Sequence, residues 1–427
     1  MAKSCGFAIL DPVQHSSLAM TFPVSSLLRR DFLRQMAFAG AASAIGGASA
    51  RAQDSITLPF ANGERQLAQY PQKRKLILLT ARPPQLETPF SVFNEGVITP
   101  NDAFFVRYHL ANIPTAIDPD AFRVTIKGAV KTPLTLSLGD LRTQFEPVEL
   151  VAVNQCSGNS RGFFQPRVGG GQLGNGAMGN ARWRGVKLRD VLEKAAVAAA
   201  ATLVSFNGLD TPVLPQTPDF VKTLSVDHAR DGEVMLAFEM NGEALPMLNG
   251  FPLRLVVPGH YGTYWVKHLN EITVLNEEFK GFWMDTAYRI PASPGACVEP
   301  GTTPAATVSI QRYNVRSFIT SHADGANVRT GQVTPVNGIA FDGGSGIREV
   351  LFSADGGRTW REAELGKDAG RYSFREWSIA VNLESKGVTE WKCRAINQIG
   401  ESQPLEPLWN PAGYMRNVVE TVRITAV

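Results

Sequence analysis

The chain has 427 residues, of which 44% are hydrophobic and 19% charged, a balance typical of a folded protein and not of a disordered one. Its length predicts two or three domains. The first 52 residues hold five of the 42 Lys and Arg and two of the 39 Asp and Glu, so the rest of the chain carries no net charge. A nucleic-acid-binding surface is therefore not supported.

An export signal is indicated at the start of the chain. The paired Arg29 and Arg30 precede a weakly apolar stretch that ends in the small residues 48–50. This is the layout of a twin-arginine signal peptide, with a mitochondrial-type or untargeted leader as the alternative. We expect residues 1–52 to direct export of the folded protein to the periplasm and to be cleaved between Ala50 and Gln53. No other apolar run approaches the roughly 18 residues of a membrane span, so no membrane attachment is expected after cleavage.

Strand and helix patterns are mixed over residues 53–295. Residues 122–127 alternate between apolar and polar, whereas residues 148–153 are almost continuously apolar and are expected to form a strand buried on both faces. The apolar residues of 188–195 recur at i, i+3, i+4 and i+7, which predicts one buried face of a helix. A third apolar strand is expected over 251–257. The mixture predicts an α+β domain.

The pattern changes near residue 300, which indicates a second domain. Residues 291–304 are rich in Pro and Gly and are typical of a linker. Beyond them the periodicity is almost wholly two, as in residues 377–383 and 422–426, with a turn at 355–357. Several short strands in this stretch predict an immunoglobulin-like β-sandwich over residues 306–427.

The cysteines exclude two common kinds of site. Cys5 belongs to the expected signal peptide, and no C-x-x-C spacing occurs, which excludes a covalently attached c-type haem and the common zinc knuckles. Cys393 alternates with charged neighbours and is expected to point into a β core. Cys297 lies in the linker, and the sequence leaves its redox state open. Cys156 follows an apolar strand.

Two short segments are candidates for chemistry. A cysteine at a strand end is well placed to meet a ligand, and the small polar residues and Arg161 that follow Cys156 favour the thiolate that binds metals. A buried structural cysteine is the alternative reading. Arg107 and His109 are expected on the same side of an extended segment. They form either an anion site or a surface pair whose hydrogen bonds are satisfied within the protein.

The segment from Gly174 to Gly179 matches G-x-G-x-x-G, but its context argues against a dinucleotide site. No strand is expected to lead into it, and the next acid, Asp190, follows too soon to reach a ribose. Motifs of serine hydrolases, zinc proteases and P-loop proteins do not occur either.

An ordered set of segments resembles the sulfite oxidase family of molybdenum enzymes over nearly the whole chain after the signal. Two stretches, 156–164 and 170–180, are most similar to bacterial periplasmic sulfite dehydrogenases, which pass electrons to cytochrome c. The segment 353–360 is similar to the family's C-terminal immunoglobulin-like domain, which is often involved in dimerisation. The other segments that carry the resemblance are Arg107-Tyr108-His109, Ala181–Trp183, Pro258-Gly259 and Trp265-Val266-Lys267.

The resemblance implies a cofactor and a set of site residues. It implies one molybdenum per chain, held by a single molybdopterin and by the Cys156 thiolate, because soft sulfur ligands suit such a metal. The positions that match the family's substrate pocket are Arg107, His109, Arg161 and Tyr288, with His109 expected to titrate near neutral pH. The positions that match its pterin contacts are Phe105, Val106, His109, Asp210, Arg254, Trp265, Val266 and Lys267. Asn249 stands where animal members have a histidine, so a pterin contact is expected there in altered form.

The function implied is that of a periplasmic sulfite dehydrogenase, which converts sulfite and water to sulfate, two protons and two electrons. No haem is expected in this chain, so a c-type cytochrome, as a separate subunit or a soluble protein, is the implied acceptor, and a homodimer is one option. The alternatives are a molybdopterin reductase acting on nitrate or methionine sulfoxide, and a periplasmic binding protein without enzymatic activity.

The export prediction can be tested with a substitution that keeps the charge. Replacing Arg29 and Arg30 together by Lys should leave uncleaved precursor in the cytoplasm, because the export pathway reads the arginine pair itself. Fractionation of the producing cells and the size of the protein measure this. Normal processing of the double variant would contradict the twin-arginine interpretation.

Overall fold

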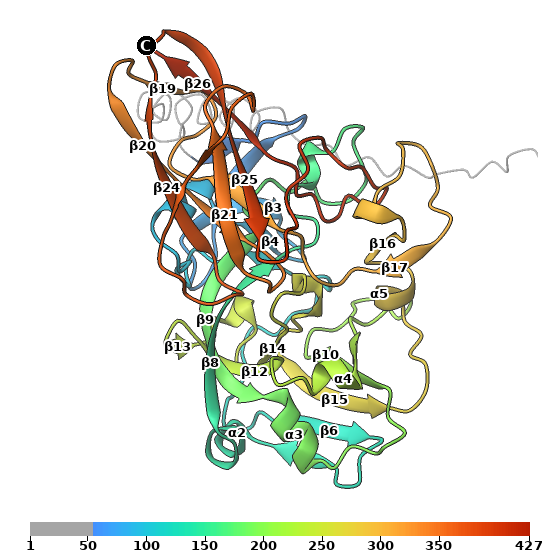
Figure 1. Cartoon of the computed structure of the whole chain (residues 1–427). Coiled ribbons are helices and arrows are strands. Elements are labelled where there is room, and N and C mark those ends of the chain that lie inside the picture. Colours follow the sequence, from blue (N-terminus) through green and yellow to red (C-terminus); the bar gives the residue numbers. More distant parts are fainter. Residues whose placement is uncertain (1–53) are drawn as a thin grey trace, which may run out of the picture. The chain divides into compact units, whose positions relative to one another are not determined.

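Strands dominate the part of the chain that the structure describes, residues 54–427 of a computed structural model (Figure 1). The expected signal peptide at 1–52 lies outside the described residues. In the described part, no helix has the length and apolar character needed to span a membrane. The predicted α+β class is confirmed, because three sheets with short helices precede a two-sheet sandwich.

The first domain contains three sheets. An antiparallel sheet has the order β1 (Ser55–Thr57), β2 (Glu64–Gln69), β3 (Lys75–Thr80), β4 (Gln85–Glu87), β5 (Val106–Arg107). A second has the order β11 (Lys222–Ser225), β10 (Leu203–Gly208), β15 (Leu269–Leu275), β6 (Val124–Gly128), β7 (Leu134–Leu136), with β15 and β6 parallel. The third has the order β13 (Glu243–Ala244), β12 (Met235–Met240), β9 (Met178–Lys187), β8 (Pro147–Gln155), and β14 (Arg254–Val256) also pairs with β12.

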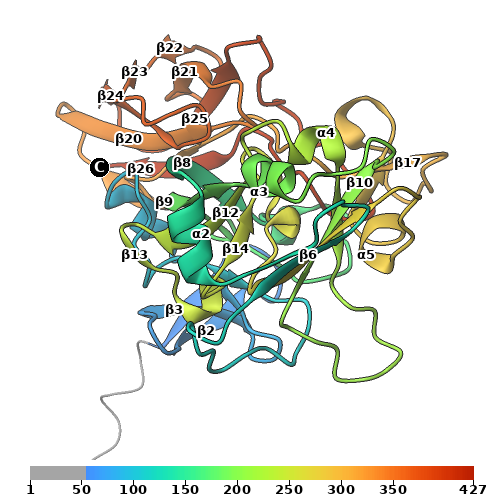
Figure 2. The ribbon, with the colours of Figure 1, turned by 90° about the horizontal axis from the view of Figure 1, so that it is seen from below.

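Short helices cover and connect these sheets. Figure 2 shows α2 (Leu138–Gln144) and α3 (Leu188–Lys194) against the sheet of β9 and β12. Helix α3 contacts both strands, and α2 contacts β9. Helix α2 begins with a capping box, in which the Ser137 hydroxyl accepts from the Asp140 N–H and the Asp140 carboxylate accepts from the Ser137 N–H. The remaining helices are α4 (Val226–Ala229), α5 (Phe282–Asp285) and the 3-10 turns η1 (Phe90–Asn94), η2 (Arg161–Phe163), η3 (Met247–Asn249), η4 (Gly262–Tyr264) and η5 (Pro294–Ala296).

The second domain is a sandwich of two sheets, reached through the hairpin of β16 (Arg289–Pro291) and β17 (Thr307–Ser309). One sheet has the order β18 (Arg316–Ile319), β20 (Val333–Phe341), β24 (Arg375–Asn382), β23 (Glu364–Leu365). The other has the order β19 (Ala326–Val328), β26 (Thr421–Ala426), β25 (Gly387–Asn397), β21 (Ile347–Ser353), β22 (Arg361–Glu362).

The described residues form three apolar cores, and the largest one crosses the boundary between the domains. The sandwich buries Trp377, Trp391 and Cys393 between its sheets, so the prediction for Cys393 is confirmed. The core of the first domain continues into Phe318 and Phe341 of the sandwich. Because apolar burial is the main favourable term in folding, this shared core fixes the C-terminal domain against the first one.

Two sequence predictions need correction. The strand expected to be buried on both faces is β8, but only its end from Ala152 onward is fully buried, because β8 is the edge strand of its sheet. The apolar run at 251–257 forms a strand only over Arg254–Val256, since Phe251 and Pro252 lie in a turn and proline has no N–H for a ladder. The predicted helix face at 188–195 is confirmed, because α3 buries it completely.

The glycine-rich segment at 174–179 has a structural partner. The buried carboxylate of Glu87 accepts hydrogen bonds from the N–H groups of Gly174, at 2.9 Å, and Gly176, at 3.1 Å. The segment thus uses its N–H groups within the protein, in agreement with the reading against a dinucleotide site. Burial raises the pKa of Glu87 to about 7, although the two N–H groups act in the opposite direction.

This raised pKa predicts how stability changes with pH. A carboxyl group whose pKa is higher in the folded than in the unfolded protein stabilises most below its unfolded value of 4.5, and this stabilisation is lost as the pH rises through about 7. Relative to Glu87→Gln, which does not titrate, the wild type should lose on the order of 3 kcal/mol between pH 4.5 and 8. Urea unfolding of both proteins across this range measures it, and parallel pH profiles would contradict the assignment.

Candidate functional site

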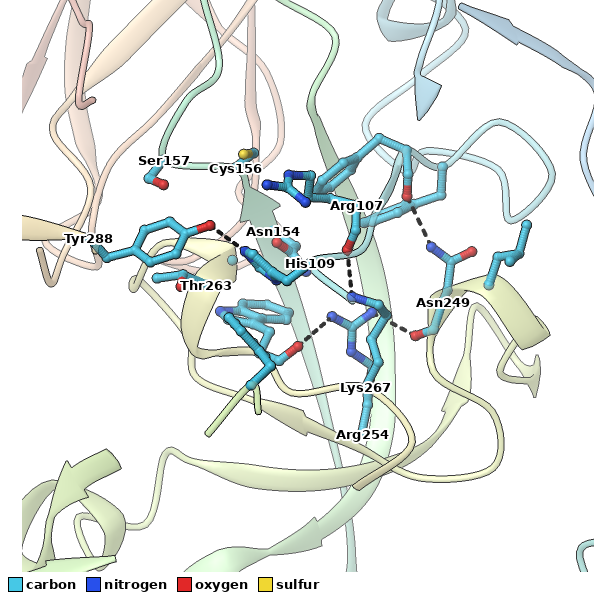
Figure 3. Close-up of a pocket in the computed structure, with 16 residues that line it drawn as sticks. Arg107, His109, Asn154, Cys156, Ser157, Asn249, Arg254, Thr263, Lys267 and Tyr288 are labelled. Carbon is cyan, nitrogen blue, oxygen red and sulfur yellow. Dashed lines mark hydrogen bonds between the residues drawn. The ribbon is translucent and has the colours of Figure 1, made fainter. Parts of the chain in front are cut away.

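The end of β8 delivers Cys156 to a pocket. Residues 152–155 are buried beside β9, and the Cys156 N–H donates to the Ala177 carbonyl at 2.9 Å. The chain then turns, with the Asn159 N–H bonded to the Cys156 carbonyl. The Cys156 side chain is half-buried and faces the pocket, so it is not a core cysteine (Figure 3).

The pocket collects residues from distant parts of the chain. Its walls include the segment around β5, the end of β8, the turn η3, strand β14, and the turn η4 with the residues that follow it. The residues predicted from the sequence that line it are Phe105, Arg107, His109, Cys156, Asn249, Arg254, Trp265, Lys267 and Tyr288. No acidic residue lines it among the residues that the structure describes.

The charged residues of the pocket are cations bound to main-chain carbonyls. Arg254 donates to the carbonyls of Asn249 and Trp265, and Lys267 donates to that of Arg107 at 2.7 Å (Figure 3). Carbonyls satisfy these donors without cancelling the charge. Burial accordingly lowers the pKa of Arg254 to about 9 and that of Lys267 to about 7. A bound anion would offset this cost, so the pocket has the electrostatics of an anion site.

His109 does not behave as the sequence suggested. Burial lowers its pKa well below the ordinary value, and Arg107, Lys267 and Lys222 lower it further, so the ring is neutral at neutral pH. Its Nε2 is hydrogen-bonded to the Tyr288 hydroxyl, and its ring stacks on Phe220 with centroids 3.8 Å apart. The expectation that His109 titrates near neutrality is therefore wrong.

Asn249 lines the pocket, but both ends of its side-chain amide are engaged within the protein. Its Oδ1 accepts from Lys73 Nζ at 2.5 Å, and its Nδ2 donates to the Phe105 carbonyl at 3.1 Å. Lys73 is buried and was not singled out from the sequence. The structure thus assigns the Asn249 amide to holding the wall of the pocket.

Four predicted residues lie outside the lining. Val106 packs in the small core of the first sheet, and Val266 packs in the main core. Asp210 is buried, and burial raises its pKa, whereas the nearby positive charge of Lys267 lowers it. Arg161 is half-buried, and its guanidinium lies over the Tyr414 ring.

Several buried polar atoms at the pocket have no hydrogen-bond partner within residues 54–427. They are Asn154 Oδ1, Ser157 Oγ, Thr263 Oγ1 and Arg254 Nε. Buried polar groups in folded proteins are almost always paired, so these atoms point to a polar ligand. The sequence analysis missed Asn154, Ser157 and Thr263, although the first two flank Cys156 closely.

The chain matches two protein-family models. Residues 109–283 match the oxidoreductase molybdopterin binding domain, and residues 307–427 match the Mo-co oxidoreductase dimerisation domain. The first match covers most of the segments that form the pocket. The second covers the sandwich and the hairpin strand β17 that leads to it.

The pocket fits a molybdopterin by the chemistry of its donors. Arg254 and Lys267 suit a phosphate, the unpaired amide and hydroxyl groups suit the heteroatoms of a pterin, and Trp265 offers an aromatic face. Cys156 supplies one thiol, the soft ligand that a sulfur-bound metal takes. No cluster of three or more His, Cys, Asp or Glu that could hold a metal occurs in residues 54–427.

Full-length comparisons agree with the domain matches. The chain is 30% identical to the sulfite oxidase of Arabidopsis thaliana over 84% of this chain and 96% of that protein. It is 35% identical to the mitochondrial sulfite oxidase of Mus musculus over 81% of this chain, and it spans 65% of the length of that protein. The crystal structure of the sulfane dehydrogenase SoxCD from Paracoccus pantotrophus shares the fold, with a TM-score of 0.68, 24% identity and coverage of 90% of this chain and 93% of that one. The chain belongs to the sulfite oxidase family of molybdopterin oxidoreductases.

Proposed function

We propose that the protein is a periplasmic sulfite dehydrogenase that oxidises sulfite to sulfate and passes the electrons to a c-type cytochrome. The observation that carries the proposal is the set of cations in the pocket of Cys156, whose described lining has no acid. Arg254 is buried there, and Arg107 and Lys267 are half-buried. Such a pocket favours a small oxyanion next to a soft ligand. The similarity to sulfite oxidases from plants and animals supports sulfite as that anion.

The proposed cofactor positions follow from the donors in the pocket. Arg254 and Lys267 would hold the phosphate of molybdopterin, and Asn154, Ser157 and Thr263 would bond polar atoms that the protein leaves unpaired. Cys156 would be the protein ligand of molybdenum. When bound, this cofactor supplies two-electron redox chemistry with oxygen transfer.

The residues around Tyr288 would receive the substrate. Arg107 is half-buried at the pocket and offers charge-assisted hydrogen bonds to the oxygens of an anion. Burial raises the pKa of Tyr288, so its hydroxyl stays protonated and bonded to the neutral His109. His109 and Tyr288 would orient an anion without adding charge. Only the cations would then attract the anion, and this limit on the attraction eases the release of sulfate.

The partner and the compartment are proposals from the sequence. The Arg29-Arg30 signal supports the periplasm, where c-type cytochromes are available as acceptors, and the match to a dimerisation domain supports self-association. Sulfite-dependent reduction of cytochrome c by the purified protein, with molybdenum measured alongside, tests the function. Reduction of nitrate or methionine sulfoxide without sulfite oxidation would overturn it.

Removing the proposed metal ligand should abolish activity. Cys156→Ser replaces a soft thiolate by a poorly ionised hydroxyl, so sulfite oxidation should fall to background while the protein stays folded. Cys297→Ser, which changes a free cysteine away from the pocket, should keep full activity and serves as the control. Activity near wild type in Cys156→Ser, measured at known molybdenum content, would show that this thiol is not a ligand.

Removing one cation should weaken the use of sulfite. Arg107→Gln loses a charge-assisted hydrogen bond of roughly 1.5–3 kcal/mol, which corresponds to about ten- to hundredfold in kcat/KM. Arg182→Gln, at an exposed ion pair with Glu149, is the matched control and should change little. Steady-state kinetics at full molybdenum loading measure both, and unchanged constants in Arg107→Gln would refute the assignment.

A further inference from the structure

A loop of the C-terminal domain, residues 409–415, is fastened to the catalytic domain. The Trp409 indole N–H donates to the Pro166 carbonyl at 2.8 Å, and the Met415 N–H donates to the Ser157 carbonyl at 3.1 Å. Ser157 follows Cys156 and lines the pocket. The loop is thus held against the segment that carries the proposed metal ligand.

The buried Asn410 gives this loop a defined shape. Its Nδ2 donates to the Tyr414 carbonyl at 2.8 Å, its Oδ1 accepts from the Tyr414 N–H at 3.1 Å, and its own carbonyl accepts from the Gly413 N–H. These bonds close the turn and hold the backbone of Tyr414 in place. The Tyr414 ring is therefore presented in a fixed position.

The Tyr414 ring contacts both Arg161 and Tyr288. The Arg161 guanidinium lies over the ring at 4.8 Å from its centroid, and the Tyr288 ring stacks on it at 5.4 Å with an interplanar angle of 11°. Tyr288 in turn bonds His109 inside the pocket. A continuous stack therefore connects Arg161, which lies outside the lining, to the groups that face the pocket.

The surroundings of Arg161 leave its charge uncancelled. No acid forms an ion pair with it within residues 54–427, and its Nε donates to the Gly413 carbonyl at 3.3 Å. Gly158 and Gly170 lie so close that a Cβ on either would come within 2.9 Å of the guanidinium. A ring under the flat face of a guanidinium holds it while its edge N–H groups remain free for an anion, whereas a carboxylate would occupy them.

We propose that Tyr414 is a positioning residue for anion binding, which the C-terminal domain supplies to the catalytic pocket by orienting Arg161 and supporting Tyr288. This inference rests on the proposed function, in which the pocket takes sulfite and releases sulfate. Because the ring orders Arg161 before the anion arrives, less side-chain freedom is lost on binding. The completed pocket thus depends on a residue from each domain.

The test is a double-mutant cycle between Tyr414 and Arg161, read by sulfate binding in calorimetry and by sulfite kinetics on molybdenum-loaded protein. Tyr414→Leu should weaken sulfate binding and raise the sulfite KM about three- to thirtyfold, with a smaller change in kcat. Tyr414→Phe keeps the ring and should stay within about twofold of wild type. Tyr414→Leu should weaken sulfate binding less in the Arg161→Met background than in the wild type, because only the support of Tyr288 is then left to lose.

The matched control is Tyr372→Leu. Tyr372 carries Arg371 at the same 4.8 Å distance but does not line the pocket, so this variant should lose stability and keep the wild-type sulfate affinity. If Tyr414→Leu does not fold, Arg161→Lys paired with Tyr414→Phe probes the same contact, because Lys keeps the charge but lacks the flat group that stacks.

The outcomes separate the two proposals. Wild-type sulfate affinity in folded Tyr414→Leu would overturn the role of Tyr414. So would a double variant whose loss of sulfate affinity equals the product of the losses in the two single variants. Failure of the wild type to oxidise sulfite would overturn the proposed function, while the sulfate-binding cycle would still decide the positioning role.

Discussion

Positive charge inside the protein that forms no ion pair within residues 54–427 is the constraint on which this structure depends. Arg254 and Lys222 are buried and Lys267 is half-buried, and the donors of all three go to main-chain carbonyls. Burying a charge is costly unless a partner compensates for it. The lowered pKa values of these groups express that cost. The folded protein therefore attracts anions to this site, because a bound anion would offset the cost of removing these charges from water.

Holding such a site requires a rigid frame from several directions. Strand β8 brings Cys156 to the pocket, β14 brings Arg254, and the turn η4 leads to Trp265. The shared core, with Phe318 and Phe341 of the sandwich, joins the frame to the C-terminal domain. The buried Arg316 adds a polar tie, since it donates to Ser160 beside the pocket segment and to Glu420 of its own domain.

Aromatic rings take the place that acids have in most arginine-rich sites. His109 lies against Phe220, Trp283 and Tyr288, and Tyr288 continues through Tyr414 to Arg161. These contacts hold polar and charged side chains by packing and cation–π attraction without neutralising them. In the proposed function, a neutral His109 and a protonated Tyr288 orient the anion while the cations attract it. The C-terminal domain takes part in this arrangement through Tyr414.

The sequence by itself determined the fold class, the helix at 188–195, the burial of Cys393 and the family, because periodicity reports local burial and an ordered set of motifs reports ancestry. It also named most of the pocket lining. It could not show that His109 is neutral, that Lys73 donates a hydrogen bond to the Asn249 side chain, or that the Arg161 guanidinium lies over the Tyr414 ring. Those facts depend on which distant groups approach one another and how deeply they are buried. Only the tertiary structure decides this, since desolvation and side-chain pairing arise between segments whose separation in the chain leaves no local pattern.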